Sequence, residues 1–282
     1  MRATERDARP ERLEARNLVK DFRLRSGVRF QTLHAVKDVS FTLEPGRTVA
    51  LVGESGSGKS TIAKMLAKLE SPTSGGVFLD GRPTATRGAG LARYRRHVQM
   101  VFQDPFASLN PFHTILHHLE RPVRIHHPQL SAAQARERAY ELLERVRLEP
   151  AASFANRRPH ELSGGQRQRV AIARALAPGA GFIVADEPVS MLDVSIRLGV
   201  LNLLADLQRE ERLGVLYITH DLATARHFSD EILVMTRGEI VERGPADDVI
   251  LRPQHEYTKT LLEAAADPDR LGALRDEVRR GG

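Results

Sequence analysis

A glycine-rich stretch has the residue types and the spacing of a phosphate-binding loop. Residues 53–61 fit the pattern Gly-x-x-x-x-Gly-Lys-[Ser/Thr], whose glycines let the backbone curl until several N–H groups point at one anion. Lys59 would then reach the β- and γ-phosphates of a nucleoside triphosphate, and the Ser60 hydroxyl would ligate Mg²⁺. A loop that only caps a helix is the alternative interpretation. The predicted loop consists of Gly53, Glu54, Ser55, Gly56, Ser57, Gly58, Lys59, Ser60 and Thr61.

Two consecutive acids follow an apolar run further along the chain. Asp186 and Glu187 come directly after residues 182–185, which read Phe-Ile-Val-Ala. This order predicts a buried parallel strand with carboxylates at its C-terminal end, where the ligands of open α/β sheets lie. We expect Asp186 to ligate Mg²⁺ through a water and Glu187 to act as the general base on the attacking water. A pair of acids that caps a helix is the alternative.

A histidine closes another apolar run. His220 follows residues 214–219, which read Gly-Val-Leu-Tyr-Ile-Thr and predict a strand. A histidine at a strand end is common, so its interpretation depends on the Asp-Glu strand beside it. There it would hold the attacking water and the γ-phosphate. Phosphoryl transfer to water needs a phosphate cradle, a metal, an oriented water and neutralised charge, and these residues could supply all four.

A second helix start has the character of an anion site. Ser163, Gly164, Gly165 and Gln166 open a helical pattern, and free N–H groups at such a start attract anions. This site lies far in sequence from the loop at residues 53–61. The two sites could face the same nucleotide only if two chains pair head to tail.

The elements that must position these residues can be read from apolar periodicity. Apolar residues 48–52 precede the glycine-rich loop and a helical pattern follows it, while short strands are expected at 13–22, 33–36 and 39–43. Further strands are expected at 77–81, 97–102, 231–235 and 239–241. The sequence therefore predicts an α/β fold: a P-loop NTPase core with a mixed, mostly parallel sheet, an N-terminal antiparallel β-layer and an inserted α-helical subdomain.

The same patterns divide the chain into segments. We expect a disordered N-terminus at 1–11, an ATPase core formed by 12–105 and 164–252, a helical insertion at 106–163, and a C-terminal tail at 253–282. Within the insertion, Ser131 and Gln134 have the spacing of a capping box. Asp193 is expected to cap a helix over 194–208.

Composition sets broader bounds. The chain has 282 residues, a net charge of +6 and no cysteine, so disulfides and thiolate metal sites are excluded. The start is charged and no apolar run approaches the roughly 20 residues of a membrane span, so we expect neither a signal peptide nor a spanning helix. The basic residues are scattered and aromatics make up only 5%, which favours a solvated basic exterior over a nucleic-acid or anionic membrane surface.

The order of the motifs resembles the nucleotide-binding subunits of ABC transporters. The resemblance extends from about residue 12 to residue 263 and rests on GESGSGKST, QMVFQDP, ELSGGQRQR, FIVADEP, SMLD and ITHD. It implies ATP and Mg²⁺ as cofactors. It also implies that Phe22, otherwise a plain core residue, stacks on adenine, and that Gln103 ligates Mg²⁺ and senses the γ-phosphate. By the same resemblance Ser163 and Gly165 serve the partner chain's ATP, and Asp193 lies in a loop that crosses the dimer interface.

The partners follow from the resemblance as well. It implies a second ATPase chain, either a paralogue in a heterodimer or a second copy in a homodimer. It further implies two integral-membrane permease subunits, an extracytoplasmic solute-binding protein reached through the complex, and no nucleic acid. The helical insertion would touch the membrane partner. The subunit would lie peripherally on the cytoplasmic face of the cell membrane.

A narrower resemblance points to the peptide/nickel subfamily, and to the second of its two paired ATPases. It rests on residues 102–111, 186–196 and 253–262. It implies ATP-driven import of oligopeptides or dipeptides. Met191 stands where the subfamily usually has alanine, Glu256 stands where it has proline, and without cysteine the tail cannot carry the iron–sulfur cluster of some relatives.

Other functions remain open within the same resemblance. A nickel or glycopeptide importer or an exporter subunit would share the fold. An ABC-type ATPase that acts on ribosomes or DNA belongs to another class. The single nucleotide domain and the lack of sustained heptads argue against that class.

Overall fold

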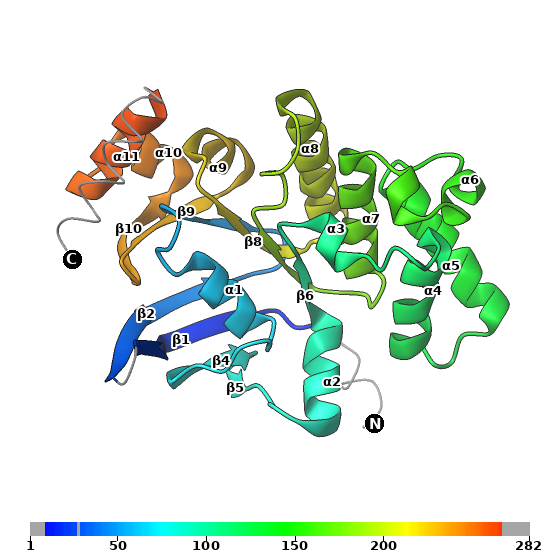
Figure 1. Cartoon of the computed structure of the whole chain (residues 1–282), viewed down its shortest axis with the longest axis horizontal. Helices are drawn as coiled ribbons and strands as arrows, with labels where there is room; N and C mark the ends of the chain where they lie inside the picture. Colours follow the sequence, from blue (N-terminus) through cyan, green and yellow to red (C-terminus); the bar gives the residue numbers. More distant parts are fainter. Residues whose placement is uncertain (1–8, 27–28, 267–282) are drawn as a thin grey trace.

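The computed structural model of the chain describes residues 9–26 and 29–266, with helices packed around two β-sheets (Figure 1). The larger sheet has the strand order β10-β9-β3-β8-β7-β6, and within it only the β10–β9 pair is antiparallel. Its strands are β3 (Thr48–Val52), β6 (Val98–Val101), β7 (Phe182–Asp186), β8 (Gly214–Thr219), β9 (Glu231–Thr236) and β10 (Glu239–Pro245). The predicted mixed, mostly parallel sheet is thus confirmed.

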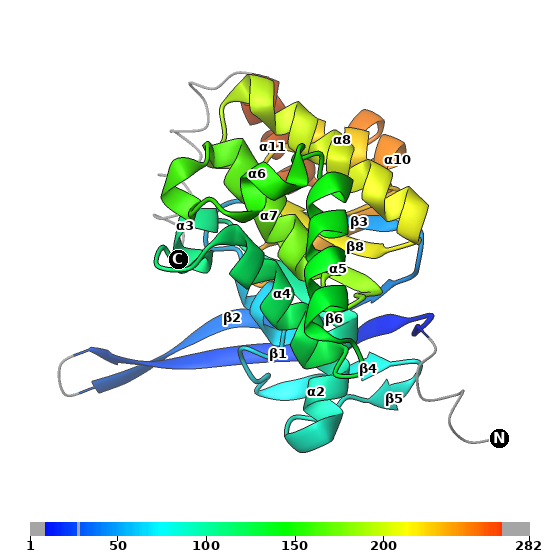
Figure 2. The same cartoon turned by 90° about the vertical axis from the view of Figure 1, so that its right-hand side faces the viewer.

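The smaller sheet is the predicted antiparallel layer, with the order β2-β1-β4-β5. Its strands are β1 (Leu13–Ser26), β2 (Arg29–Leu43), β4 (Ser74–Leu79) and β5 (Arg82–Pro83). The two short strands expected at 33–36 and 39–43 are one strand, and β1 continues beyond residue 22. Asp38 has a φ of 50° at an irregularity of the β1–β2 pairing, which the strand passes without ending. Figure 2 shows the β1–β2 ribbon reaching away from the rest of the chain.

The predicted insertion is helical and stands to one side of the larger sheet (Figure 1). It contains α3 (Pro105–Ser108), α4 (Ile115–His126), α5 (Ala132–Arg145), α6 (Ala151–Ala155) and a 3₁₀ turn (Pro159–Glu161), and it leads into α7 (Gly164–Leu176). The predicted capping box is present: the Ser131 hydroxyl accepts the Gln134 N–H at 3.3 Å, and the Gln134 side chain accepts the Ser131 N–H at 2.9 Å. We refer to α3–α6 as the α-helical subdomain.

The remaining helices include two that the sequence did not predict, α2 (Gly88–His97) and α9 (Leu222–Phe228). The others are α1 (Lys59–Leu66), α8 (Val194–Glu211), α10 (Ala246–Leu251) and α11 (Glu256–Ala266). Asp193 precedes α8, but the prediction that its side chain caps the helix is wrong. The backbone oxygen of Asp193 accepts the N–H groups of Ile196 and Arg197, at 2.9 and 3.0 Å, and its carboxylate makes no capping bond.

The larger sheet is covered on both faces, which explains why its strands read as continuous apolar runs. In β3, Val49 and Leu51 belong to an apolar cluster shared with the smaller sheet and α1. Ala50 and Val52 belong to the cluster on the opposite face, which is shared with the α-helical subdomain, α7 and α8. Successive side chains of a strand point to opposite faces, so each strand is fixed from two sides.

The ends of the chain differ in part from the expectation. Residues 1–8 of the predicted disordered N-terminus lie outside the described residues, but residues 9–11 are docked on the fold. The Arg9 guanidinium donates to the backbone oxygen of Glu211 at 2.8 Å, Pro10 is buried, and the Glu11 N–H donates to Asp80 at 2.9 Å. Residues 267–282 of the predicted tail also lie outside the described residues. Within the described ranges, no helix has the length and apolar character that a bilayer crossing requires.

Candidate nucleotide site

The glycine-rich loop lies between β3 and α1, as the sequence predicts, and its packing requires glycine at both ends of the motif. A Cβ at Gly53 would come within 2.0 Å of the backbone oxygen of Met235. Gly58 has a φ of 107°, and a Cβ there would lie 2.3 Å from the backbone oxygen of Ala35. Because both obstacles are backbone atoms of neighbouring strands, a side chain at either position would displace the loop.

Lys59 is the first residue of α1 and it is buried. Its Nζ donates to the backbone oxygens of Gly53 and Glu54, both at 2.7 Å. Burial lowers the pKa of Lys59, and the nearby charges of Glu187, Asp186 and Glu54 oppose this effect. The Lys59 side chain therefore lies along the loop, where phosphate oxygens could replace the carbonyl oxygens as its partners.

Ser60 and Asp186 meet at the start of α1 and the end of β7. The Ser60 hydroxyl donates to Oδ1 of Asp186 at 3.1 Å. Burial raises the pKa of Asp186, and the hydrogen bond from Ser60 opposes this rise. A hydroxyl and a carboxylate are the donors that Mg²⁺ takes from proteins when phosphates and waters complete its shell. Within residues 9–26 and 29–266 no larger group of acids or histidines could hold a metal, so the donor set fits Mg²⁺ bound together with a nucleotide.

Glu187 directly follows β7 and has a left-handed backbone conformation. It has a φ of 44°, and its N–H donates to the backbone oxygen of Ile218 in β8 at 3.0 Å. Its Oε2 accepts a hydrogen bond from Nε2 of Gln103 at 3.1 Å and lies 3.4 Å from Nδ1 of His220. Gln103, Glu187 and His220 follow β6, β7 and β8, which are neighbours, so the carboxyl ends of parallel strands bring them together.

The interaction with His220 sets the charges at this point. The hydrogen bond between the two side chains lowers the pKa of Glu187 and raises the pKa of His220. Burial opposes both shifts without cancelling either. The arrangement therefore favours a carboxylate beside an imidazolium, with the histidine side chain 59% exposed and accessible to a ligand.

Phe22 lies apart from these residues, on β1 of the smaller sheet. Phe22 pairs in register with Leu33 on β2. Its side chain is half-buried, and Nζ of Lys20 lies 4.8 Å from the centroid of its ring. Phe22 is therefore not a fully buried core residue, and part of its ring is accessible to solvent.

The second helix start is built as a capping box. The Ser163 hydroxyl accepts the Gln166 N–H at 3.3 Å, and the Gln166 side chain accepts the Ser163 N–H at 3.0 Å. A Cβ on Gly165 would lie 2.5 Å from Cγ2 of Ile196, and one on Gly164 would lie 3.2 Å from Leu192. The start of α7 therefore packs against the residues on either side of Asp193, an exposed residue. Two predicted interface segments thus lie side by side.

The sequence did not predict two further contacts of the loop, both made by Glu54. The backbone N–H of Glu54 donates to the hydroxyl of Tyr257 on α11 at 3.1 Å, and Thr236 donates to the Glu54 carboxylate at 3.2 Å. Residues 54 and 257 are 203 positions apart, and no spacing or local pattern links them.

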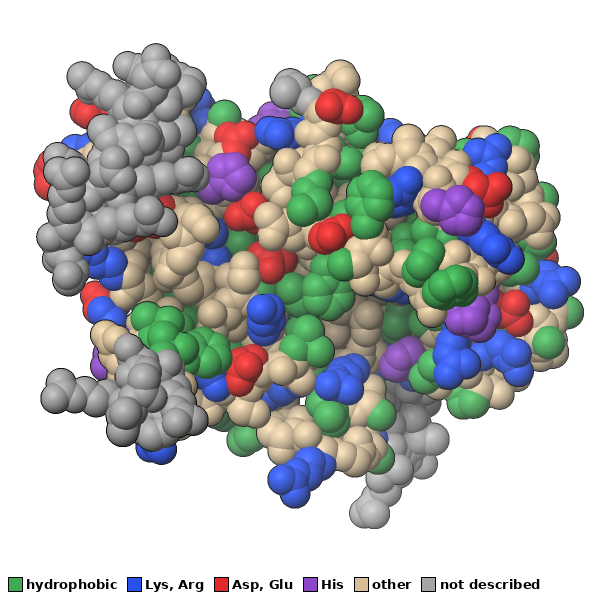
Figure 3. All heavy atoms as spheres, in the orientation of Figure 1, with side chains coloured by type: hydrophobic (Ala, Val, Ile, Leu, Met, Phe, Trp, Pro, Cys, Tyr) green, Lys and Arg blue, Asp and Glu red, His purple; other side chains and the backbone are tan. Residues whose placement is uncertain are grey.

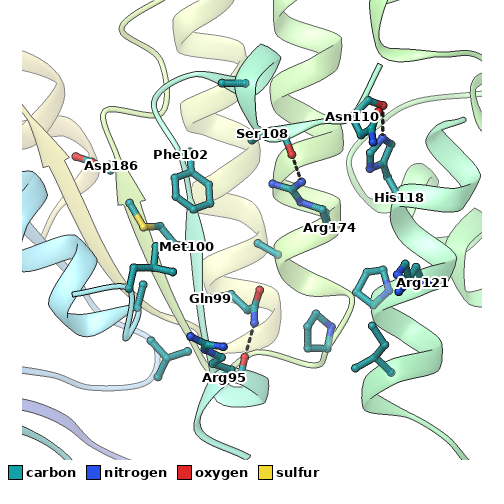
Figure 4. Close-up of a pocket in the computed structure, with 18 of the residues that line it drawn as sticks. Arg95, Gln99, Met100, Phe102, Ser108, Asn110, His118, Arg121, Arg174 and Asp186 are labelled. Carbon is teal, nitrogen blue, oxygen red and sulfur yellow. Dashed lines mark hydrogen bonds between the residues drawn. The ribbon is translucent and has the colours of Figure 1, made fainter. Parts of the chain in front are cut away.

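A groove of about 1160 Å³ runs from Ser60 and Asp186 past Gln103 to histidines of the α-helical subdomain. Figure 4 shows its two sides: Asp186, Phe102 and Met100 on the sheet side, and His118 and Arg121 on the helical side. Arg174 and Ser108 also line the groove, and the Arg174 guanidinium donates to the backbone oxygen of Ser108. Figure 3 shows histidine and Lys/Arg side chains gathered on the face of the helical subdomain.

Comparisons with known proteins show which family the chain is similar to. Residues 36–190 match the family model described as ABC transporter. The chain is 48% identical over 264 residues to the glutathione import ATP-binding protein GsiA of Escherichia coli K12, covering 92% of this chain and 42% of that protein. It is 45% identical over 261 residues to a probable peptide ABC transporter ATP-binding protein, y4tS, of Sinorhizobium fredii, covering 91% and 73%. The chain thus spans less than half the length of GsiA.

Solved structures show the same fold. One is a dimeric, post-hydrolysis state of the ATP-binding cassette MJ0796 bound to ADP and Pi, with a TM-score of 0.72 and 34% identity. The alignment covers 83% of this chain and 98% of that one. Another is cbiO1 from Clostridium perfringens, part of the ABC transporter complex cbiONQ, with a TM-score of 0.73, 25% identity, and coverage of 95% and 99%.

Proposed function

The chain belongs to the ABC transporter family, and on that premise we propose that it binds and hydrolyses ATP as the nucleotide-binding subunit of a membrane transporter. The observation that carries this proposal is the meeting of Gln103, Glu187 and His220 beside the Ser60–Asp186 pair. These groups lie at one edge of one sheet, next to the phosphate loop.

Each residue has a defined task in the proposed reaction. Lys59 and the N–H groups of the loop hold the β- and γ-phosphates, and Ser60, Asp186 and Gln103 hold Mg²⁺. Mg²⁺, when bound, neutralises charge on the phosphates. Glu187 accepts a proton from the attacking water through its carboxylate.

His220 and Phe22 complete the proposed site. His220 orients Glu187 and stabilises negative charge near the γ-phosphate, since its own pKa is raised. Phe22 stacks on adenine with the accessible part of its ring. The phosphates and the base are thus held by two different sheets.

We propose that two chains share each ATP. Residues 163–166 of one chain face the nucleotide on the loop of the other, and Asp193 lies at the contact between the chains. The packing of the start of α7 against Leu192 and Ile196 supports this, because it presents both segments together. The dimeric form of the MJ0796 cassette supports it as well. The second chain is another copy or a paralogue.

Mixing two inactive variants tests the shared site. Lys59→Ala removes the phosphate contact, and Ser163→Arg blocks the start of α7. Each variant alone should show no ATPase activity. In a mixed dimer, one of the two sites combines the intact loop of one chain with the intact α7 start of the other, so activity should return on mixing. If the wild-type protein hydrolyses ATP but the mixture of the two variants stays inactive, the two results together would contradict the shared site.

We further propose that the transporter imports peptides. Of the relatives named above, GsiA is named as a protein of glutathione import, and glutathione is a tripeptide, while y4tS is named as a probable peptide transporter protein. In this proposal, two permease subunits and an extracytoplasmic solute-binding protein complete the complex, and the chain lies on the cytoplasmic face of the membrane. Cells that carry Glu187→Gln in place of the native chain should lose uptake of labelled di- and tripeptides and keep uptake of free amino acids. Unchanged peptide uptake would exclude this solute class.

A further inference from the structure

Glu54, the second residue of the phosphate loop, is held at three points. Its backbone N–H donates to Tyr257 at 3.1 Å, its backbone oxygen accepts from Lys59 at 2.7 Å, and its carboxylate accepts from Thr236 at 3.2 Å. The three partners come from α11, α1 and the end of β9. The position of Glu54 therefore depends on the C-terminal helix as well as on the nucleotide core.

The hydroxyl groups of Tyr257 and Thr236 hold two different parts of Glu54. The Tyr257 hydroxyl accepts from the Glu54 N–H at 3.1 Å, and the Thr236 hydroxyl donates to the Glu54 carboxylate at 3.2 Å. The backbone and the side chain of Glu54 are thus held by separate contacts, and removing the Tyr257 hydroxyl takes away the acceptor of the backbone N–H only.

Tyr257 is itself fixed by the way α11 begins. The carboxylate of Glu242 on β10 accepts the N–H of Gln254 at 2.8 Å and the N–H of His255 at 3.0 Å. Nδ1 of His255 then accepts the N–H of Tyr257 at 3.1 Å. Two successive contacts, from Glu242 to His255 and from His255 to Tyr257, thus lead from the edge strand of the larger sheet to the tyrosine.

Burial holds the same helix from its inner side. Thr258 and Ala264 are fully buried and Leu261 is nearly so, while Glu256 and Lys259 pair with each other on the exposed side. The ring of Tyr257 packs against the apolar cluster of the core. The packing of the aromatic ring therefore fixes the position of the Tyr257 hydroxyl. Through its hydrogen bond to Glu54, the hydroxyl can in turn fix the position of the phosphate loop.

We propose that Tyr257 is a positioning residue for ATP binding and that α11 is part of the nucleotide site. The inference rests on the proposed function, because it assigns a role at the same phosphate loop. Without the Tyr257 hydroxyl, the phosphate loop adopts its phosphate-binding conformation for a smaller fraction of the time. The apparent Kd for ATP rises by the inverse of that fraction, while the rate at saturating ATP stays the same.

Tyr257→Phe tests the role because it removes only the hydroxyl and keeps the ring. The variant should bind ATP with a Kd raised about fivefold, the effect expected for a partly buried N–H left without a partner. Its kcat should stay within about twofold of the wild type, since Gln103, Glu187 and His220 are untouched. Tyr140→Phe, the same change at a half-buried tyrosine of α5, is the matched control and should leave both quantities unchanged.

Two results would overturn the role. One is a Kd for ATP in Tyr257→Phe equal to that of the wild type. The other is a fall in kcat with an unchanged KM, as expected if the hydroxyl only supported the fold. Wild-type protein that binds no ATP would refute the proposed function instead.

Hydrogen exchange tests the contact without nucleotide. The Glu54 amide should be protected in the wild type and in Tyr140→Phe, and it should exchange about fivefold faster in Tyr257→Phe. Equal protection in all three proteins would show that the Tyr257 hydroxyl does not hold the loop.

Discussion

Oε2 of Glu187 and Nδ1 of His220 lie 3.4 Å apart, at the ends of two neighbouring parallel strands. Oε2 also accepts a hydrogen bond from Gln103 at 3.1 Å. Glu187, the proposed base, follows β7, and it is held by Gln103 and His220, which follow the two neighbouring strands β6 and β8. Both contacts hold the carboxylate in position, and the contact with His220 also lowers the pKa of Glu187.

The first prediction concerns the titration of His220. Since the hydrogen bond with Glu187 is the main cause of the raised pKa of His220, Glu187→Gln should bring this pKa down towards 6.5. NMR of the imidazole signals over a pH series measures the change. His118, whose pKa is lowered by burial and which bonds Asn110, should titrate identically in both proteins. A His220 pKa that does not fall would mean that Glu187 is not its charged partner.

The second prediction concerns stability as a function of pH. The raised pKa of His220 contributes stability below its unfolded value of 6.5, and this is lost as pH rises through the folded pKa. The lowered pKa of Glu187 contributes stability above its unfolded value of 4.5, and this is lost as pH falls through the folded pKa. The stability difference between wild type and His220→Ala should therefore be largest between these two values.

Urea unfolding at a series of pH values measures this difference. It should stay small at every pH, because the histidine is largely exposed and solvent screens the pair. A difference that grows steadily above pH 7 would contradict the assigned direction of the His220 shift.

The third prediction concerns hydrolysis. Glu187→Gln keeps the size of the side chain but removes the proton acceptor, so the hydrolysis rate should fall by about 10²–10⁴. ATP should still bind, because Lys59, Ser60 and Asp186 are unchanged, and size-exclusion chromatography should show an ATP-dependent dimer. Turnover at the wild-type rate would exclude Glu187 as the general base.

The fourth prediction compares two glycines of the loop that both have positive φ. Gly56→Ala meets no atom within 4 Å, so only backbone strain of about 1 kcal/mol opposes it. Gly58→Ala adds a methyl group 2.3 Å from the backbone oxygen of Ala35, so the loop must move. Gly58→Ala should therefore lose most ATP affinity while Gly56→Ala keeps most of it, as measured by calorimetry. Equal losses would mean that strain, rather than this contact, governs the loop.

Local signals were sufficient for much of the fold and for proposing Lys59, Asp186, Glu187 and His220 as site residues, whereas Gln103 and Phe22 were proposed from the family resemblance. The strand, loop and helix around Lys59 were predicted because apolar periodicity changes on the two sides of a glycine-rich motif. The position of Asp186 and Glu187 at the end of β7 was predicted because four apolar residues precede them. Because the carboxyl ends of parallel strands meet at one edge of a sheet, His220 could be expected beside the acids that follow β7, and the structure adds Gln103 after β6.

Features that depend on distant contacts were missed. α2 was not predicted because no side chain caps its start and only Tyr94 and His97 are buried in it. β2 was divided in two because Lys37 and Asp38 resemble a turn. The Lys37 N–H instead donates to Gly238 at 2.8 Å, which holds the strand in place. The contact of Tyr257 with Glu54 arises only from tertiary packing, and the positive φ of Glu187 had no sequence signal either.

The attachment of α11 to Glu242 determines what becomes of a shortened polypeptide. A chain that stops before residue 254 keeps the carboxylate but loses both of its N–H donors, and it also loses the buried side of α11. Newly exposed apolar surface marks such a product for cellular proteases. A premature stop codon in this region would therefore lower the abundance of the protein instead of yielding a smaller working enzyme.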